Sequence, residues 1–180
     1  FDGHVGGVLA QLEAHGVPRT AHLETLSPAT VELYPAPHKP RVVSLEVEQV
    51  VVPRGDDRWV EEAWALKERI REAEGVLRQR RSFFDRAYRR ARIHCFRAGD
   101  AMVGFAAART DGYVLFLAVA PEYRGQGFGE RLVAAVAEEC DTVTCHARAT
   151  NEDALGFYRH LGFETVRHVA GYYEDGGDAY

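Results

Sequence analysis

The chain has 180 residues and a formal net charge of −5, with 46% hydrophobic and 27% charged residues. This length allows one α/β domain with a hydrophobic core, and the acidic balance excludes a global basic field for nucleic acid. No signal peptide is visible, and no apolar run approaches the roughly 18 to 20 residues that span a bilayer. We therefore expect a cytoplasmic protein with neither a nucleic-acid nor a membrane partner.

Residues 1–40 are expected to form an N-terminal appendage. Four aliphatic residues recur at helical spacing and predict a short helix over residues 4–15. Three prolines within residues 35–40 then indicate an extended linker. The main domain is therefore expected over residues 41–180.

Two helices are predicted in the first part of this domain, after a strand. The strand is an aliphatic run from Arg41 to Pro53. Asp56 or Asp57 can cap the first helix, and a second helix is expected from about Val76 to Ala91. The candidate inner residues of the two helices are Trp59, Ala63, Leu66, Ile70, Leu77, Phe84 and Tyr88.

The helical region is locally basic, because ten Lys and Arg residues stand against four acidic ones between Lys67 and Arg92. A solvated helix face is one interpretation of this charge. The other is a surface that attracts an acidic partner or the phosphates of a cofactor.

A β-meander and two further helices are predicted in the rest of the chain. Turn signals at Ala98-Gly99-Asp100 and Asp111-Gly112 separate the meander strands. The predicted elements are strands at 93–97, 102–109 and 113–120, a helix at 129–139, a strand at 143–147, a helix from Asn151 to His160 that Gly162 stops, a strand at 163–169 and the start of another at 178–180. This order indicates a mixed α/β layer architecture.

The three cysteines, Cys95, Cys140 and Cys145, match no zinc-binding or CxxC spacing. We expect reduced thiols and no metal site. His146 follows Cys145, but neighbouring residues of a strand point to opposite faces.

The strongest chemical signal is a glycine-rich loop between the strand at 113–120 and the helix at 129–139. Such a loop exposes backbone N–H groups at a helix N-terminus, where the helix dipole also favours anions. Glycines at 125, 127 and 129 would let the main chain approach a phosphate closely. The pattern predicts a phosphate or pyrophosphate cradle. The alternative is a tight strand-to-helix turn without a ligand.

Arg124-x-x-Gly127-x-Gly129 matches the R/Q-x-x-G-x-G/A motif of the GNAT superfamily, which the sequence resembles from about Val42 to Tyr180. The resemblance implies an α/β fold with a mixed, mostly antiparallel central sheet and helices on both faces. It also implies acetyl-CoA as cosubstrate, with a backbone N–H near Val119 polarising the thioester carbonyl. The implied cofactor-binding residues are Leu117, Ala118, Val119, Arg124, Gly125, Gln126, Gly127, Phe128, Gly129, Asn151 and Tyr158.

The segment from Asn151 to Phe163 resembles the second acetyl-CoA motif of this superfamily. Asn151 can cap its own helix, and in the relatives it also contacts the cofactor. Tyr158 is expected near the CoA sulfur, where a phenol can protonate the leaving thiolate as general acid. A packed aromatic residue with a satisfied hydroxyl is the alternative role for Tyr158.

The C-terminal segment resembles the hairpin of protein N-terminal α-amino acetyltransferases, which carry Tyr-Tyr-x-Asp-Gly-x-Asp-Ala there. Tyrosines of that hairpin line the slot for the substrate's first residues, so Tyr172 and Tyr173 are expected to bind substrate. A hairpin with surface aromatics is the alternative. These relatives continue their last strand beyond the position of Tyr180, and we therefore expect further residues after it.

One position departs from these relatives. They often carry a Glu five residues before the motif Asn, as a candidate base, where this chain has His146. An imidazole can act as a base near neutral pH, so His146 is the candidate here. A polar substrate-side role or a structural role is the alternative.

Together these features predict direct attack of an amine on acetyl-CoA, with Tyr158 as general acid and without a metal. The preferred acceptor is a protein or peptide N-terminal α-amine. The alternatives are a lysine or small-molecule amine on the same fold, and a non-catalytic CoA-binding sensor.

Overall fold

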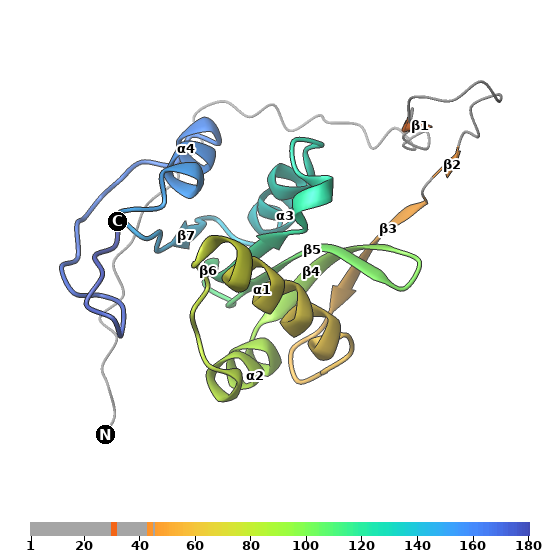
Figure 1. Ribbon diagram of the computed structural model, residues 1–180, viewed down its shortest axis with the longest axis horizontal. Coiled ribbons are helices and arrows are strands. Elements are labelled where there is room, and N and C mark those ends of the chain that lie inside the picture. Colours follow the sequence, from red (N-terminus) through yellow and green to blue (C-terminus); the bar gives the residue numbers. More distant parts are fainter. Residues whose placement is uncertain (1–29, 32–42, 45) are drawn as a thin grey trace.

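The computed structural model in Figure 1 describes residues 30–31, 43–44 and 46–180. The helix predicted over 4–15 and the linker at 35–40 lie outside the described residues, and the division at residue 40 stays a prediction. No helix of the described part of the chain is long and apolar enough to cross a membrane.

The centre of the fold is a five-stranded sheet in the order β3-β4-β5-β6-β7. Neighbouring strands from β3 to β6 are antiparallel, whereas β6 and β7 are parallel. The strands are Val47–Val52 (β3), Arg92–Ala98 (β4), Ala101–Ala108 (β5), Tyr113–Val119 (β6) and Thr144–Cys145 (β7). A separate antiparallel pair joins β1 (Thr30–Val31) to β2 (Val43–Ser44), so the single strand predicted from Arg41 to Pro53 is divided.

Helices cover both faces of the sheet, as predicted (Figure 1). Helices α1 (Val60–Glu74) and α2 (Arg81–Arg90) pack on one face, around Phe84 and Phe105. Helix α3 (Phe128–Ala137) packs on the other face through Leu132, beside α4 (Glu152–His160). Successive strand residues point to opposite faces, so Phe105 and Ala106 of β5 belong to different core clusters. The predicted mixed, mostly antiparallel α/β fold is confirmed.

Several predicted details of the helices are wrong. Neither Asp56 nor Asp57 caps α1; Asp56 instead accepts the backbone N–H of Arg58, and Trp59 occupies the N-cap with φ 59°. The second helix begins at Arg81 rather than near Val76, because Leu77 has φ 53° and cannot continue a right-handed helix.

Two predicted strands are shorter than their sequence patterns indicate. The strand at 143–147 is reduced to the two residues of β7 that pair with β6. In the stretch 163–169 only Val169 has a ladder partner within the described part of the chain; that partner, Ala179, also bridges to Arg148. Hydrogen bonds from Ala147 and Ala149 to the last residues of the chain take the place of a longer ladder.

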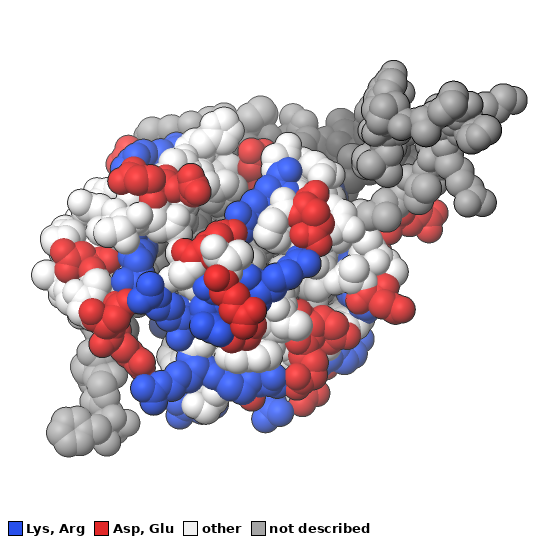
Figure 2. Space-filling view, viewed as in Figure 1, with Lys and Arg blue, Asp and Glu red and all other residues white. Residues whose placement is uncertain are grey.

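The basic helical region carries many ion pairs. Figure 2 shows Lys and Arg interspersed with Asp and Glu over this face of the molecule. The arginines of the region reach acidic partners in the pairs Arg69–Glu122, Arg71–Glu68, Arg78–Asp175, Arg81–Asp85, Arg89–Asp57 and Arg92–Glu139. This arrangement favours the interpretation as a solvated, self-neutralised face.

Candidate active site

Strands β6 and β7 part immediately after they pair. Their parallel pairing joins Tyr113 to Thr144 and Val114 to Cys145, and goes no further. The next residue of β6, Leu115, forms a bulge, because Ala107 and Ala108 of β5 pair with Phe116 and Val114. A bulge bends its strand and breaks the ladder. Beyond Val114, the edge of β6 that faces β7 has no strand partner in the described part of the chain.

This free edge carries the residues predicted to bind the pantetheine arm. Leu117 and Val119 are half-buried and Ala118 is buried. An unpaired strand edge can bind an extended ligand through its backbone groups. The carbonyl of Val119 accepts a hydrogen bond from Arg124 Nε at 3.2 Å, which ties the glycine loop to the end of the strand.

The glycine loop has the backbone that an anion cradle needs. Gly125 and Gly127 have φ of 72° and 81°, and Gly127 is the N-cap of α3. The structure shows no hydrogen-bond acceptor among the described residues for the backbone N–H groups of residues 126–129. Phe128 anchors the start of the helix by packing against Phe96, with ring centroids 5.2 Å apart. The loop therefore presents unpaired donors at a helix N-terminus.

The three motif glycines have different structural reasons. A Cβ at Gly125 or Gly127 would meet no heavy atom within 4 Å, so only their positive φ demands glycine. A Cβ at Gly129 would lie 3.0 Å from Phe157 Cε2, so this glycine permits close packing of α3 against α4. Around the loop, Gln126 Nε2 donates to the carbonyl of Glu122 at 3.3 Å.

Asn151 begins α4 as expected. Its Oδ1 accepts the backbone N–H of Ala154 at 3.1 Å, so its role as helix cap is confirmed. At the other end of the helix, Gly162 has φ 86° and its N–H donates to Arg159, while Phe163 N–H donates to Tyr158. This is the expected glycine stop.

A polar cavity of about 420 Å³ lies between the end of α1 and the start of α4. Its lining includes Asn151, Arg148 and Glu74. Glu74 also forms an ion pair of 2.7 Å with Arg124. Glu74, on the wall of this cavity, thus reaches the arginine of the glycine loop.

Tyr158 is packed between aromatic rings beside β7. Its ring centroid lies 5.2 Å from that of Phe157 and 5.0 Å from that of Phe163. Burial raises the pKa of Tyr158 well above its usual value, and the neighbouring Cys145 raises it further. Burial also raises the pKa of the Cys145 thiol to about 12. Both groups therefore keep their protons at neutral pH, the state in which a phenol can act as an acid.

His146 packs against two tyrosines, Tyr113 and Tyr172. Its Nδ1 shares a hydrogen bond of 2.7 Å with the hydroxyl of Tyr113, and its ring stacks on Tyr172 with centroids 4.2 Å apart. The Nε2 atom is buried and has no hydrogen-bond partner among the described residues. Burial lowers the pKa of His146 below 6.5. The imidazole is therefore neutral at physiological pH and can accept a proton.

Tyr113 belongs to this cluster but was missed in the sequence, where it looks like an ordinary strand aromatic. Its hydroxyl bonds to His146 and lies 3.2 Å from the hydroxyl of Tyr172. The signal that could have found it is its place at the start of β6, opposite the start of β7. The parallel pairing of these strands brings residues 113 and 146 together.

The structure therefore brings most of the predicted site residues into two groups. Tyr158 and His146 line a common cavity of about 40 Å³. Tyr172 stacks on His146, and Tyr173 packs edge-on against Tyr172 at 4.9 Å. Asn151 lines the second, larger cavity, and Glu74 of the same lining forms the ion pair with Arg124 of the glycine loop. The catalytic and binding roles of these residues stay predictions.

Part of this domain matches the model of a known protein family. Residues 89–165 match the acetyltransferase (GNAT) domain. This part of the chain is therefore a GNAT acetyltransferase domain.

Similar proteins include N-terminal acetyltransferases. The chain is 36% identical over 100 residues to N-alpha-acetyltransferase 30 of Xenopus laevis, a match that covers 47% of this chain and 37% of that protein. The human protein of the same name matches at the same identity, over 47% of this chain and 28% of its own length. The match thus spans well under two-thirds of these relatives.

Solved structures share the fold. The ribosomal-protein-S18-alanine N-acetyltransferase of Escherichia coli superposes with a TM-score of 0.58 at 22% identity, covering 73% of this chain and 90% of that one. Ard1 of Thermoplasma volcanium gives a TM-score of 0.59 at 19% identity, with 73% and 93% covered. A NatC complex bound to Gag peptide and CoA gives 0.54 at 25% identity, with 73% and 94% covered.

Proposed function

We propose that this chain transfers an acetyl group from acetyl-CoA to the N-terminal α-amine of a protein or peptide. The observation that carries the proposal is a protonated phenol, Tyr158, and a neutral imidazole, His146, on the walls of one cavity. Amine acetylation needs both an acid for the leaving thiolate and a base for the attacking ammonium.

The residues of the glycine loop fit the cosubstrate. The N–H groups at the start of α3, which have no acceptor among the described residues, suit a diphosphate. Arg124, whose guanidinium pairs with Glu74 in the structure, begins the same loop and could turn to a phosphate. The free edge of β6 at Leu117, Ala118 and Val119 can bind the pantetheine arm through its backbone. Acetyl-CoA would supply an activated acyl group, so no nucleophilic residue of the chain is required.

His146 is proposed to take the proton of the amine. When Nδ1 carries the ring hydrogen and donates it to Tyr113, Nε2 presents a free lone pair. That atom has no hydrogen-bond partner among the described residues, so its lone pair is free to accept a proton directly or through one water. Tyr113 orients the ring in the same way that a second partner orients many catalytic imidazoles.

Tyr158 is proposed to supply the other proton. Its raised pKa makes it a weak acid at rest, and it becomes effective only toward a strongly basic thiolate that forms beside it. Packing against Phe157 and Phe163 holds the ring in one orientation. Precise orientation is a main part of what such a site contributes to the rate.

The acceptor is proposed to bind against Tyr172 and Tyr173. Tyr172 contacts His146, so a substrate on the hairpin would reach the base. Similarity to proteins named N-alpha-acetyltransferases supports an N-terminal α-amine as the acceptor. A plant structure of this fold was solved with a bisubstrate analogue, CoA-Ac-MVNAL, that joins CoA to a peptide.

The test is transfer from labelled acetyl-CoA to a panel of free N-terminal peptides, lysine peptides with blocked N-termini, and polyamines. We expect label on the free N-terminal peptides alone. Label only on lysine peptides or polyamines would instead indicate a lysine or small-molecule N-acetyltransferase. Binding of CoA without transfer to any acceptor would indicate the CoA-binding sensor.

A further inference from the structure

The hairpin of residues 172–177 is tied to two other parts of the chain through a single carboxylate. Asp175 Oδ1 accepts a hydrogen bond from Arg148 at 3.0 Å, and its Oδ2 accepts one from Arg78 at 2.8 Å. Arg148 follows β7, whereas Arg78 belongs to the segment between α1 and α2. Asp175 therefore links the hairpin to both walls of the larger cavity, which Arg78 and Arg148 line.

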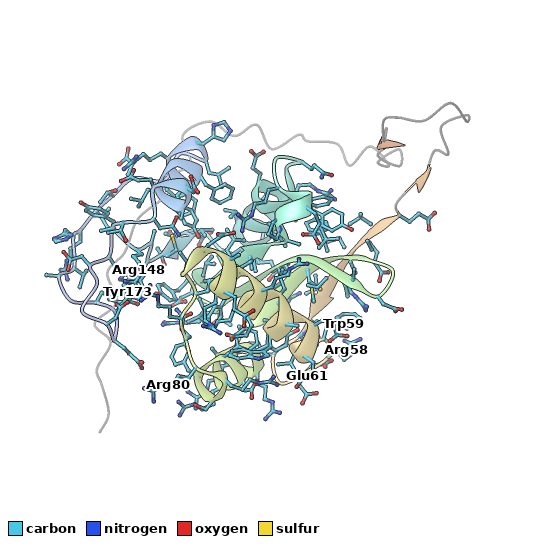
Figure 3. All side chains as sticks on the ribbon, in the orientation of Figure 1. Arg58, Trp59, Glu61, Arg80, Arg148 and Tyr173 are labelled. Atoms are coloured by element: carbon cyan, nitrogen blue, oxygen red, sulfur yellow. The ribbon has the colours of Figure 1, made fainter. Side chains whose placement is uncertain are left out.

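Arg148 is the better-buried of the two arginines. Its side chain is 18% exposed, against 58% for Arg78. Its guanidinium lies over the ring of Tyr173, 4.0 Å from the centroid, and Figure 3 shows the two residues side by side near the end of α1. A Cβ on Gly177 would come within 2.1 Å of its Nη1, so any other residue there would require the guanidinium to shift. Arg148 is thus enclosed between Tyr173, Gly177 and Asp175.

A continuous row of contacts runs from this arginine to the candidate base. Tyr173 packs edge-on against Tyr172 at 4.9 Å, and Tyr172 stacks on His146 at 4.2 Å. An arginine over an aromatic face adds attraction to the packing. The position of Arg148 therefore affects the orientation of the tyrosines that face His146.

The segment to which Arg78 is attached is itself held firmly. Lys67 of α1 is fully buried, and its Nζ donates to the carbonyl of Gln79 at 2.5 Å and to Glu68 at 2.8 Å. Arg78 Nε also donates to the carbonyl of Gly75 at 2.6 Å. The segment that carries Arg78, the second partner of Asp175, is therefore fixed to α1.

We propose that Arg148, fastened by Asp175, is a positioning residue that holds Tyr173 and the hairpin in the conformation that receives the acceptor. The identity of the acceptor rests on the function proposed above, whereas the ordering of the hairpin does not. Ion pairs at a protein surface contribute little to global stability, so the network orders one local segment rather than the fold. Its loss should raise the KM for the acceptor and leave the chemical step intact.

The experiment compares four variants of the full chain. R148Q and D175N remove the network, and R80Q and E174Q are their matched controls. Arg80 and Glu174 lie on the same surface, are 83% and 89% exposed, and approach one another only to 3.9 Å. With a peptide that the wild type acetylates, we expect R148Q and D175N to raise the peptide KM about tenfold with kcat and the CoA Kd within about twofold. The controls should match the wild type, and R148Q/D175N should be no worse than R148Q alone.

Hydrogen exchange of residues 171–178 gives a second readout that needs no activity. The amides of Tyr173 and Gly176 are hydrogen-bonded within the hairpin and should exchange faster in R148Q and D175N, but not in R80Q or E174Q. G177A, which crowds Arg148, should act in the same direction. Unchanged exchange in R148Q and D175N would overturn the proposal whatever the acceptor is. Faster exchange with an unchanged peptide KM would overturn the role in acceptor binding, and a wild type that acetylates no peptide would refute the proposed function alone.

Discussion

The imidazole of His146 lies nearly parallel to the ring of Tyr172, with an interplanar angle of 8° and centroids 4.2 Å apart. His146 directly follows β7, whereas Tyr172 belongs to the C-terminal hairpin, 26 positions later in the chain. Their contact joins the candidate base to the surface proposed for the acceptor. An amine delivered along the hairpin would meet a neutral imidazole at its end.

Replacement of Tyr158 by Phe tests the general acid. We expect turnover to fall by roughly 10- to 1,000-fold, because the leaving thiolate loses its proton donor. The CoA Kd should change little, since the ring and its packing against Phe157 and Phe163 are kept. Stopped-flow or steady-state kinetics with titration calorimetry would measure both. Wild-type turnover in Tyr158→Phe would reduce this residue to a packing role.

The pH dependence of kcat/KM tests His146. Only the neutral imidazole can accept a proton, and burial lowers the pKa of His146 below 6.5. Activity should therefore fall as the pH drops through the lowered pKa of His146 and the imidazole becomes protonated. This fall should occur at a lower pH than it would with an exposed histidine as the base. Ionisation of a peptide α-amine adds a separate limb at about pH 8. His146→Ala should lower the rate and remove the acidic limb while the amine limb remains; retention of both rate and profile would assign the base to another group.

Tyr113 is expected to act through His146. Tyr113→Phe removes the hydrogen bond to Nδ1 and with it the ring's orienting partner, so we expect kcat to fall about tenfold. Because the effect passes through the imidazole, Tyr113→Phe should cost nothing further in a His146→Ala background. Additive losses in the double variant would show that Tyr113 has a role of its own.

Gly127→Val tests the anion cradle. Gly127 needs a positive φ, which costs a side-chain-bearing residue about 1–2 kcal/mol and displaces the neighbouring N–H groups. We expect CoA affinity to fall at least tenfold. Gly99→Val is the matched control, since Gly99 also has a positive φ and open space at Cβ but lies in the β4–β5 turn. Equal CoA affinity in the two variants would contradict the assignment of the loop.

Local signals predicted most of the central fold. The β4–β5–β6 meander, the glycine loop and α4 with its Asn151 cap and Gly162 stop all depend on residues close together in the chain. The predicted strand at 163–169 was wrong because an apolar pattern cannot show whether a partner strand is available. Among the described residues, only Val169 of this stretch has a bridge partner.

The contacts among the candidate site residues could not be predicted from the sequence, although the candidates themselves could be named from it. His146, Tyr158 and the hairpin tyrosines were recognisable from motif positions. The bond between Tyr113 and His146 joins residues 33 apart and exists only because β6 and β7 run parallel. No sequence motif predicts the contact between Arg148 and Asp175, because that contact depends on how the hairpin folds back.

The central claim is transfer of an acetyl group to an N-terminal α-amine. It is tested most directly by one peptide that contains both a free α-amine and a lysine, incubated with the wild-type chain and acetyl-CoA and analysed by fragment mass spectrometry. We predict a single acetyl group on the α-nitrogen, formed far more slowly by Tyr158→Phe. Acetylation of the lysine alone, or of neither amine while CoA binds, would contradict it.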